Sequence, residues 1–291
     1  MSHALAEKPR APVLHEQRIE AGGVHWQLRR QGHGPALLLL HGTGASLHSW
    51  QALAAELQSH HTLWSLDLPG HARSGPLPAR RRSLPGMAAA LGDLLQALDL
   101  QPRAVLGHSA GAALMLRLAL DGRLPGARLL GLNAALLPFD GWAGFLFPPL
   151  ARLLALNPVV PWLAAWRAQD PAAVRRLIAA TGSRLDEAGV AAYAALLRQP
   201  THVAGVLAMM ASWDLQGLQD ALPRLQRPLH LLVADRDGTV PPAQAERLAA
   251  RWPASVHLHR LHGLGHLAHE EAPDRVAAAL APLLAGAGRG S

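Results

Sequence analysis

The sequence contains no cysteine among its 291 residues. This absence excludes disulfide bonds, thiolate metal sites and a cysteine nucleophile, and it fits a reducing cytoplasm, where we expect the protein to reside. Aromatic residues make up only 4% of the chain, so the place where they gather is informative. The opening stretch MSHALAEKPRAPVLHEQ has no apolar run, and we therefore expect no signal peptide.

Charged residues are also sparse, at 16%, and the formal net charge is +7. The tightest basic run, Arg80-Arg81-Arg82, lies in a proline-rich stretch without interleaved aromatics, which argues against binding of nucleic acid. The apolar stretch Trp142–Trp166 contains Arg152 and several prolines, so we expect no transmembrane span there. Contact with a membrane surface stays open.

Short apolar runs alternate with helical segments along most of the chain. A predicted hairpin pairs residues 16–20 with 24–30, and six further strands are predicted at 36–40, 62–66, 103–106, 128–132, 229–233 and 256–261. Most of these runs lack polar alternation, as expected for strands buried on both faces. Helices are predicted over 87–98 and 110–120. The pattern predicts an α/β fold with a mostly parallel, doubly wound sheet.

This alternation stops after Asn133, and residues 134–214 show helical segments without a convincing strand. We expect a helical lid there, inserted between core parts 1–133 and 215–291. Most of the aromatics lie in this insertion. This concentration favours a lid that lines an apolar pocket. The candidate lining residues are Phe139, Trp142, Phe145, Trp162, Trp166 and Trp213.

The motif GHSAG, residues 107–111, directly follows an apolar run. The pattern G-x-S-x-G indicates a sharp strand-to-helix turn that exposes a serine, here Ser109. A serine nucleophile needs a base and an acid that orients the base. In a doubly wound α/β sheet we expect both partners at the carboxyl ends of later strands. Tight turns without catalysis use the same small residues, so the partners decide the interpretation.

Candidates for both partners follow the last two strands. Asp235 and Asp237 compete for the acid, and His262, His266 and His269 compete for the base. The glycines that flank His266 suit a loop that carries it toward the serine. The alternating His257 and His259 lack further ligands at convincing spacing, so we expect no metal site and no cofactor.

Five stretches together resemble the α/β-hydrolase superfamily: HGTGASLHSW, DLPGHARS, GHSAG, DGTVP and GLGH. The resemblance implies that Ser109 is the nucleophile, His266 the general base and Asp237 the orienting acid. It also implies an oxyanion hole made by the backbone N–H groups of Thr43 and Ala110. Ala72 departs from the superfamily, which usually has glycine there.

The lid sequence carries a narrower resemblance, over 131–158 and 181–215, to magnesium-chelatase accessory proteins of bacteriochlorophyll synthesis. It implies a role near magnesium insertion, with an apolar substrate such as a tetrapyrrole and chelatase subunits as partners. Two functions follow: an esterase-type serine hydrolase, or a non-catalytic protein that binds a tetrapyrrole or the chelatase. A general carboxylesterase, a C–C bond hydrolase or a cofactor-free haloperoxidase would use the same triad.

Overall fold

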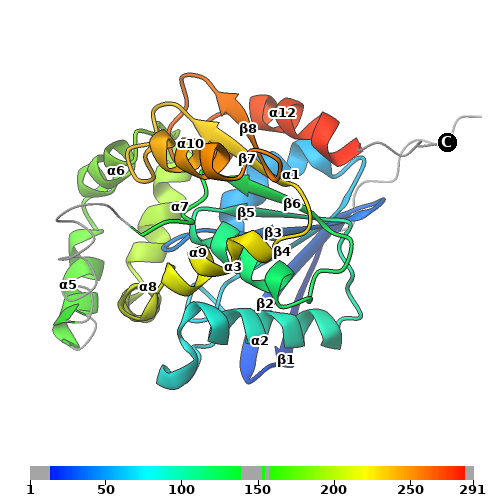
Figure 1. The fold of residues 1–291 in the computed structure, drawn as a ribbon. Helices are drawn as coiled ribbons and strands as arrows, with labels where there is room; N and C mark the ends of the chain where they lie inside the picture. The colour runs from blue at the N-terminus through cyan, green and yellow to red at the C-terminus, as the bar shows by residue number, and fades with distance from the viewer. Residues whose placement is uncertain (1–13, 139–152, 155–156, 286–291) are drawn as a thin grey trace, which may run out of the picture.

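Eight strands form one sheet in the computed structural model, which describes residues 14–138, 153–154 and 157–285 (Figure 1). Their order is β1-β2-β4-β3-β5-β6-β7-β8, with β2 antiparallel to β1 and β4 and the remaining pairs parallel. The predicted α/β-hydrolase architecture is confirmed. The strands are β1 His15–Ala21, β2 Val24–Gly32, β3 Ala36–Leu40, β4 Thr62–Leu66, β5 Ala104–His108, β6 Arg128–Leu132, β7 Leu229–Ala234 and β8 Val256–Leu261.

Helices cover both faces of this sheet. Those of the core are α1 Gln51–Leu57, α2 Leu84–Ala97, α3 Ala110–Leu120, α9 Gln216–Ala221, α10 Pro242–Arg251, α11 Ala268–Glu271 and α12 Pro273–Ala285. Short 3₁₀ helices occur at η1 Leu47–Trp50, η2 Ala79–Arg81 and η3 Leu222–Arg224. Side chains from α2, α3, α9 and α10 build one apolar layer, while α1, α11 and α12 build the other. The central strands β3 to β7 are therefore buried on both sides, as their unbroken apolar runs predict.

Two predicted boundaries shift for local reasons. The helix predicted over 87–98 begins at Leu84, because the Ser83 side chain accepts the Gly86 N–H and caps the first turn. The strand predicted to end at Leu106 continues to His108, where Gly107 and His108 still pair with β6. The GHSAG motif thus begins inside the strand.

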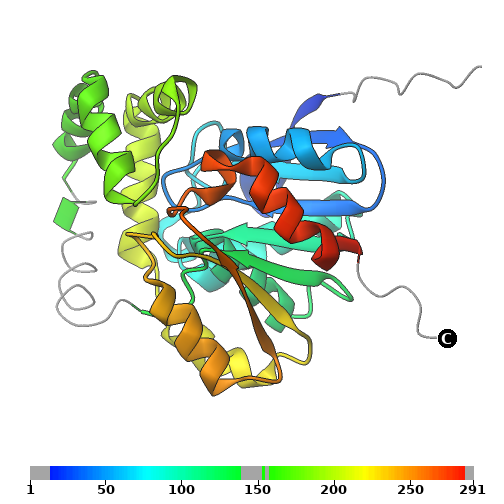
Figure 2. The ribbon, with the colours of Figure 1, turned by 90° about the horizontal axis from the view of Figure 1, so that it is seen from above.

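Between β6 and β7 the described residues form helices joined by loops, with no strand among them. Besides α9 and η3 this segment contains α5 Val159–Arg167, α6 Pro171–Ala180, α7 Glu187–Leu197 and α8 Pro200–Ser212. These four helices lie together at one end of the sheet, away from the end of α12 (Figure 2). We keep the name lid for residues 134–214, a boundary that remains a proposal.

Helix α5 has an inverted apolar pattern at the outer edge of the lid (Figure 1). Its buried residues are the small Pro161 and Ala165, whereas Trp162 and Trp166 are 69% and 66% exposed. The two tryptophans were predicted to line a pocket. The structure instead turns them to solvent, because the inward positions of this helix are occupied by small side chains. Among the described residues, no helix is long and apolar enough to span a bilayer.

One close approach fastens the lid to the core. A Cβ added at Gly205, in α8, would lie 1.8 Å from the backbone oxygen of Gly70. The two glycines therefore allow helix and loop to touch directly, at a distance no side chain would permit.

We predict that Gly205→Ala destabilises the protein by about 1–3 kcal/mol, because the methyl group forces the lid helix off the core. Gly217→Ala is the matched control. Gly217 lies in α9 with no atom within 4 Å of an added Cβ, so alanine there should stabilise by about 0.5–1 kcal/mol. Urea unfolding midpoints measure both effects. Equal shifts in the two variants would contradict the close approach.

Candidate active site

Ser109 occupies a strained backbone position directly after β5. Its φ is 52° and its ψ −118°, a conformation that costs a non-glycine residue about 1–3 kcal/mol. The neighbouring glycines explain the turn: a Cβ at Gly107 would lie 2.5 Å from the Ala112 Cα, and one at Gly111 would lie 2.1 Å from the Leu40 oxygen. Small residues thus let α3 pack against β5 and β3 immediately after the serine.

Asp237 and His266 form a buried pair on the loops that follow β7 and β8. His266 Nδ1 lies 2.7 Å from Asp237 Oδ2, and the residues are only 6% and 7% exposed. The other oxygen, Oδ1, accepts the N–H groups of Thr239 at 2.7 Å and Val240 at 2.8 Å. A carboxylate only accepts, so Nδ1 carries the proton and Nε2 keeps its lone pair. This is the tautomer that a general base needs.

The competing residues do different work. Asp235 lies on the surface, where it accepts the Gly263 N–H at 2.7 Å and lies 3.4 Å from His262. His269 is fully buried between Trp50 and His108, at centroid distances of 4.5 and 4.6 Å. Burial lowers the pKa of His269 to about 3, which makes it a neutral packing residue.

Two side chains hold the carbonyl of His266. The His108 ring lies 2.9 Å from this oxygen through Nε2, which therefore carries the ring proton. Asn133 donates from Nδ2 to the same oxygen at 2.8 Å and accepts the Ala234 N–H at 2.8 Å. Asn133, whose φ is 46°, was not predicted as a site residue from the sequence. Its signal was available: asparagine after a buried strand is a residue that tolerates left-handed backbone.

The loop that carries Thr43 is fixed from the core side by His41. The Leu68 N–H donates to His41 Nε2 at 2.9 Å, so Nδ1 is protonated and donates to the Gly42 oxygen at 2.7 Å. A Cβ at Gly42 would lie 2.9 Å from the Ser109 Cβ, which brings this loop against the serine. Ala110 opens α3, where the first N–H groups have no acceptor within the helix.

The lid holds the same loop from the other side through His202, in α8. Its Nδ1 accepts the Ala72 N–H at 3.0 Å, so Nε2 donates to the Gly44 oxygen at 3.2 Å. Ala72 has a φ of 43°, the left-handed backbone for which the superfamily uses glycine. The sequence gives no local signal for His202, because its partners are more than a hundred residues away.

Burial also sets the charges around the site. It lowers the pKa of His41 and His108 well below the usual value, and that of His48 and His202 to about 4. Burial raises the pKa of Glu270 to about 8, although the Tyr193 hydroxyl donates to Glu270 Oε1 at 2.7 Å. At neutral pH the surroundings of the site are thus largely uncharged.

The remaining lid candidates divide. Trp213 is half-buried and packs on the apolar layer that includes α3 and α9, whereas Phe139, Trp142 and Phe145 lie outside the described residues.

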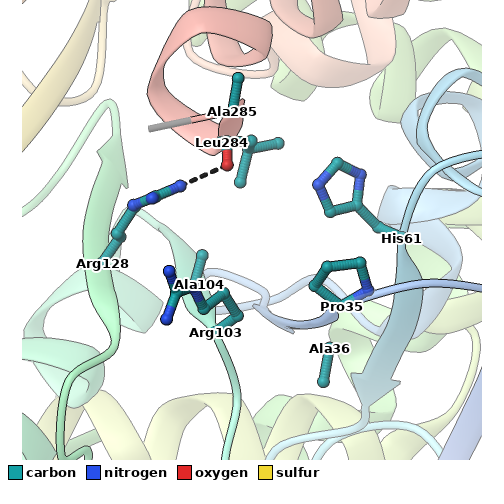
Figure 3. A pocket seen from close by; sticks show the side chains of 8 residues that line it. All are labelled: Pro35, Ala36, His61, Arg103, Ala104, Arg128, Leu284 and Ala285. Carbon is teal, nitrogen blue, oxygen red and sulfur yellow. Dashed lines mark hydrogen bonds between the residues drawn. The ribbon is translucent and has the colours of Figure 1, made fainter. Parts of the chain in front are cut away.

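A cavity of about 190 Å³ lies away from these residues, between residues such as Ala36, Ala104 and Arg128 that begin strands (Figure 3). Ser109, Asp237 and His266 follow strand ends, so this cavity is at the opposite edge of the sheet. Within the described ranges, no group of three or more potential ligands could hold a metal ion.

Comparison with known proteins agrees with this fold. The profile of the alpha/beta hydrolase fold matches residues 35–273. The chain belongs to this family. A solved α/β hydrolase fold protein from Burkholderia ambifaria superposes with a TM-score of 0.75 at 25% identity, over 92% of this chain and 99% of that one.

Two bacterial proteins are similar to this chain over most of its length. The magnesium-chelatase 30 kDa subunit of Rhodobacter capsulatus is 42% identical over 259 residues, which are 88% of this chain and 90% of that protein. The pimeloyl-[acyl-carrier protein] methyl ester esterase of Vibrio vulnificus is 29% identical over 254 residues, 80% of this chain and 87% of that protein. Both predicted resemblances are confirmed: to the superfamily and to a chelatase-associated protein.

The buried titratable groups predict a stability maximum near neutral pH. As pH falls below 6.5, the unfolded chain binds protons that the folded protein excludes, so stability is lost. The groups responsible have folded pKa values of about 3 or 4: His48, His71, His202 and His269. Asp67, with a pKa raised to about 6, partly opposes them. Glu270 has the opposite sign: between pH 4.5 and 8 only the folded protein keeps its proton, so stability falls as pH rises.

Urea unfolding at pH 5 to 9 checks this profile. Glu270→Gln should flatten the decline between about pH 7 and 8, where the wild type loses at most about 1.4 kcal/mol per pH unit from this group. The control is Glu246→Gln, at an exposed residue paired with Arg260. A decline that is unchanged in Glu270→Gln would show that Glu270 is ionised in the folded protein.

Proposed function

We propose that this α/β-hydrolase is a serine hydrolase that cleaves an ester or related acyl bond, in the service of magnesium insertion into (bacterio)chlorophyll precursors. The observation that carries the proposal is the buried Asp237–His266 pair on the strand edge that also presents the strained Ser109. The chelatase subunit relative supports the pathway, and the esterase relative supports the chemistry.

In this proposal Ser109 Oγ attacks the acyl carbonyl while His266 Nε2 takes its proton. Asp237 holds the ring and stabilises the imidazolium that forms. The N–H groups of Thr43 and Ala110 donate to the oxyanion. His266 then returns the proton to the leaving alcohol, and water releases the acyl group from Ser109 by the same steps. His41 and His202 contribute indirectly to the stabilisation of the oxyanion, because they fix the loop that carries Thr43.

Labelling with a fluorophosphonate tests the nucleophile, with intact mass as the readout. We expect stoichiometric modification of the wild type and none of Ser109→Ala, because only an activated serine reacts. His266→Ala and Asp237→Asn should slow labelling by about 10³–10⁴-fold.

The competing residues supply matched controls: His262→Ala and Asp235→Asn should label at the wild-type rate. If the folded wild type is not labelled, the hydrolase proposal is wrong. If Asp235→Asn is as slow as Asp237→Asn, the acid is misassigned.

A second function, binding of a tetrapyrrole or the chelatase without catalysis, is favoured by the 42% identity to a chelatase subunit. It predicts that Ser109→Ala, which keeps the fold, binds protoporphyrin or chelatase subunits as tightly as the wild type. Quenching of tryptophan fluorescence and co-sedimentation measure the two partners. Binding that is retained in Ser109→Ala, together with no hydrolysis by the wild type, would assign the physiological role to binding. Absence of binding to either partner would remove this alternative.

A further inference from the structure

A short lid segment passes between the two loops that carry Asp237 and His266. This strap, Thr181-Gly182-Ser183, connects α6 to α7. The Thr181 carbonyl accepts the His266 N–H at 3.1 Å and the Gly238 N–H at 3.0 Å. Ser183 Oγ accepts the Leu267 N–H at 2.8 Å. The residue after each proposed triad partner, and His266 itself, is therefore bonded to the lid.

Three glycines make this contact possible. A Cβ at Gly182, whose φ is +79°, would lie 1.8 Å from the Arg236 oxygen. One at Gly265 would lie 2.3 Å from the Gly182 carbonyl carbon, and one at Gly238 would lie 2.7 Å from the Ala180 oxygen. The strap and the two loops thus touch backbone to backbone, closer than any side chain would permit.

The lid also takes in the side chain next to the proposed base. Leu267 is 6% exposed and belongs to a small apolar cluster formed mainly by α6 and α7, with Val174, Ile178 and Val190. Both the amide and the side chain of Leu267 therefore depend on the lid. Ser183 is itself only 2% exposed, so water does not replace its hydroxyl when that is removed.

These contacts complete the fixation of His266. Its carbonyl is held from the core by His108 and Asn133, its N–H is held from the lid by Thr181, and its ring is held by Asp237. The backbone of His266 is thus held on both sides, and its ring is held at Nδ1. Without the strap, only the carbonyl and the ring hydrogen bond would orient it.

We propose that the strap is a positioning element of the triad and that Ser183 is its positioning residue: the histidine loop holds its ring correctly only when the lid is seated on it. This inference rests on the proposed hydrolase function. It makes the lid part of the catalytic framework, and it confines any opening for substrate to parts of the lid other than the α6–α7 junction. A ligand or partner that displaces this junction would disable the serine without touching it.

Ser183→Ala tests the inference, because it leaves the buried Leu267 N–H without an acceptor at a cost of about 1–3 kcal/mol. If this cost falls on the orientation of His266, the fluorophosphonate labelling rate should drop about tenfold or more across the pH profile. Asp186→Ala is the matched control. The Asp186 side chain accepts the Gly189 N–H and caps α7, so its loss weakens the same lid without touching the strap. Labelling of Asp186→Ala should match the wild type even where its Tm falls.

A second readout does not require a reactive serine. The proton on His266 Nδ1, shared with Asp237, gives a low-field NMR resonance that His266→Gln identifies by its loss. We expect this resonance to shift or broaden in Ser183→Ala and to stay unchanged in Asp186→Ala. Hydrogen exchange of the wild type adds a measurement free of variants: the His266 and Leu267 amides should exchange as slowly as those of α6 and α7.

The outcomes separate the two proposals. If the wild type is not labelled but its low-field resonance responds to Ser183→Ala, the proposed hydrolase function is wrong and the positioning role of the strap is supported. A wild type that is labelled, with Ser183→Ala equal to Asp186→Ala in rate and resonance, would show that the strap is only structural. Fast exchange of the His266 and Leu267 amides in a protected core would also overturn it. Should Ser183→Ala fail to fold, this exchange experiment decides alone.

Discussion

The hydrogen bond between Asp237 Oδ2 and His266 Nδ1 sets the demands that much of the surrounding structure meets. The bond is buried, so both partners must be fully satisfied, and the carboxylate is: its other oxygen takes two backbone N–H groups of its own loop. The imidazole has a narrower requirement, because its remaining nitrogen must stay free for chemistry. Orientation of the ring therefore falls on the peptide groups around it. That explains why one carbonyl, that of His266, attracts donors from two separate strand ends.

Buried, neutral histidines make several of the hydrogen bonds that fix the loops of the site. His41 and His202 each accept one backbone N–H and donate to one backbone carbonyl, and so join two loops that share no regular structure. An imidazole can do this only in its neutral form, with one donor and one acceptor nitrogen. Burial keeps it neutral, since desolvation disfavours the cation. The same burial that preserves the hydrogen-bond pattern makes the framework sensitive to acid.

Sequence was sufficient for features whose cause is local. The strands follow from apolar runs, and the Ser109 turn follows from a cluster of small residues that no other structure explains. Asp237 was separable from Asp235 only by resemblance, and the geometry behind that choice, burial against His266, is not visible in the chain. His202 and Ser183 were missed because their partners are 158 and 84 residues away. Trp162 and Trp166 show a further limit: an excess of aromatics locates the lid but does not tell which face of a helix they occupy.

The lid therefore has two unlike parts. Its inner part, α6 to α8 with the strap, contributes backbone acceptors and His202 to the site and is fastened by glycine contacts at Gly182 and Gly205. Its outer part, α5, presents large apolar side chains to solvent and contributes no hydrogen bond to the loops of Ser109, Asp237 or His266 among the described contacts. The inner part and the outward apolar helix therefore have different roles. The first would hold the proposed catalytic groups in place, and the second offers an apolar surface away from the strap, so the proposed catalysis and the proposed partner binding are physically compatible in one chain.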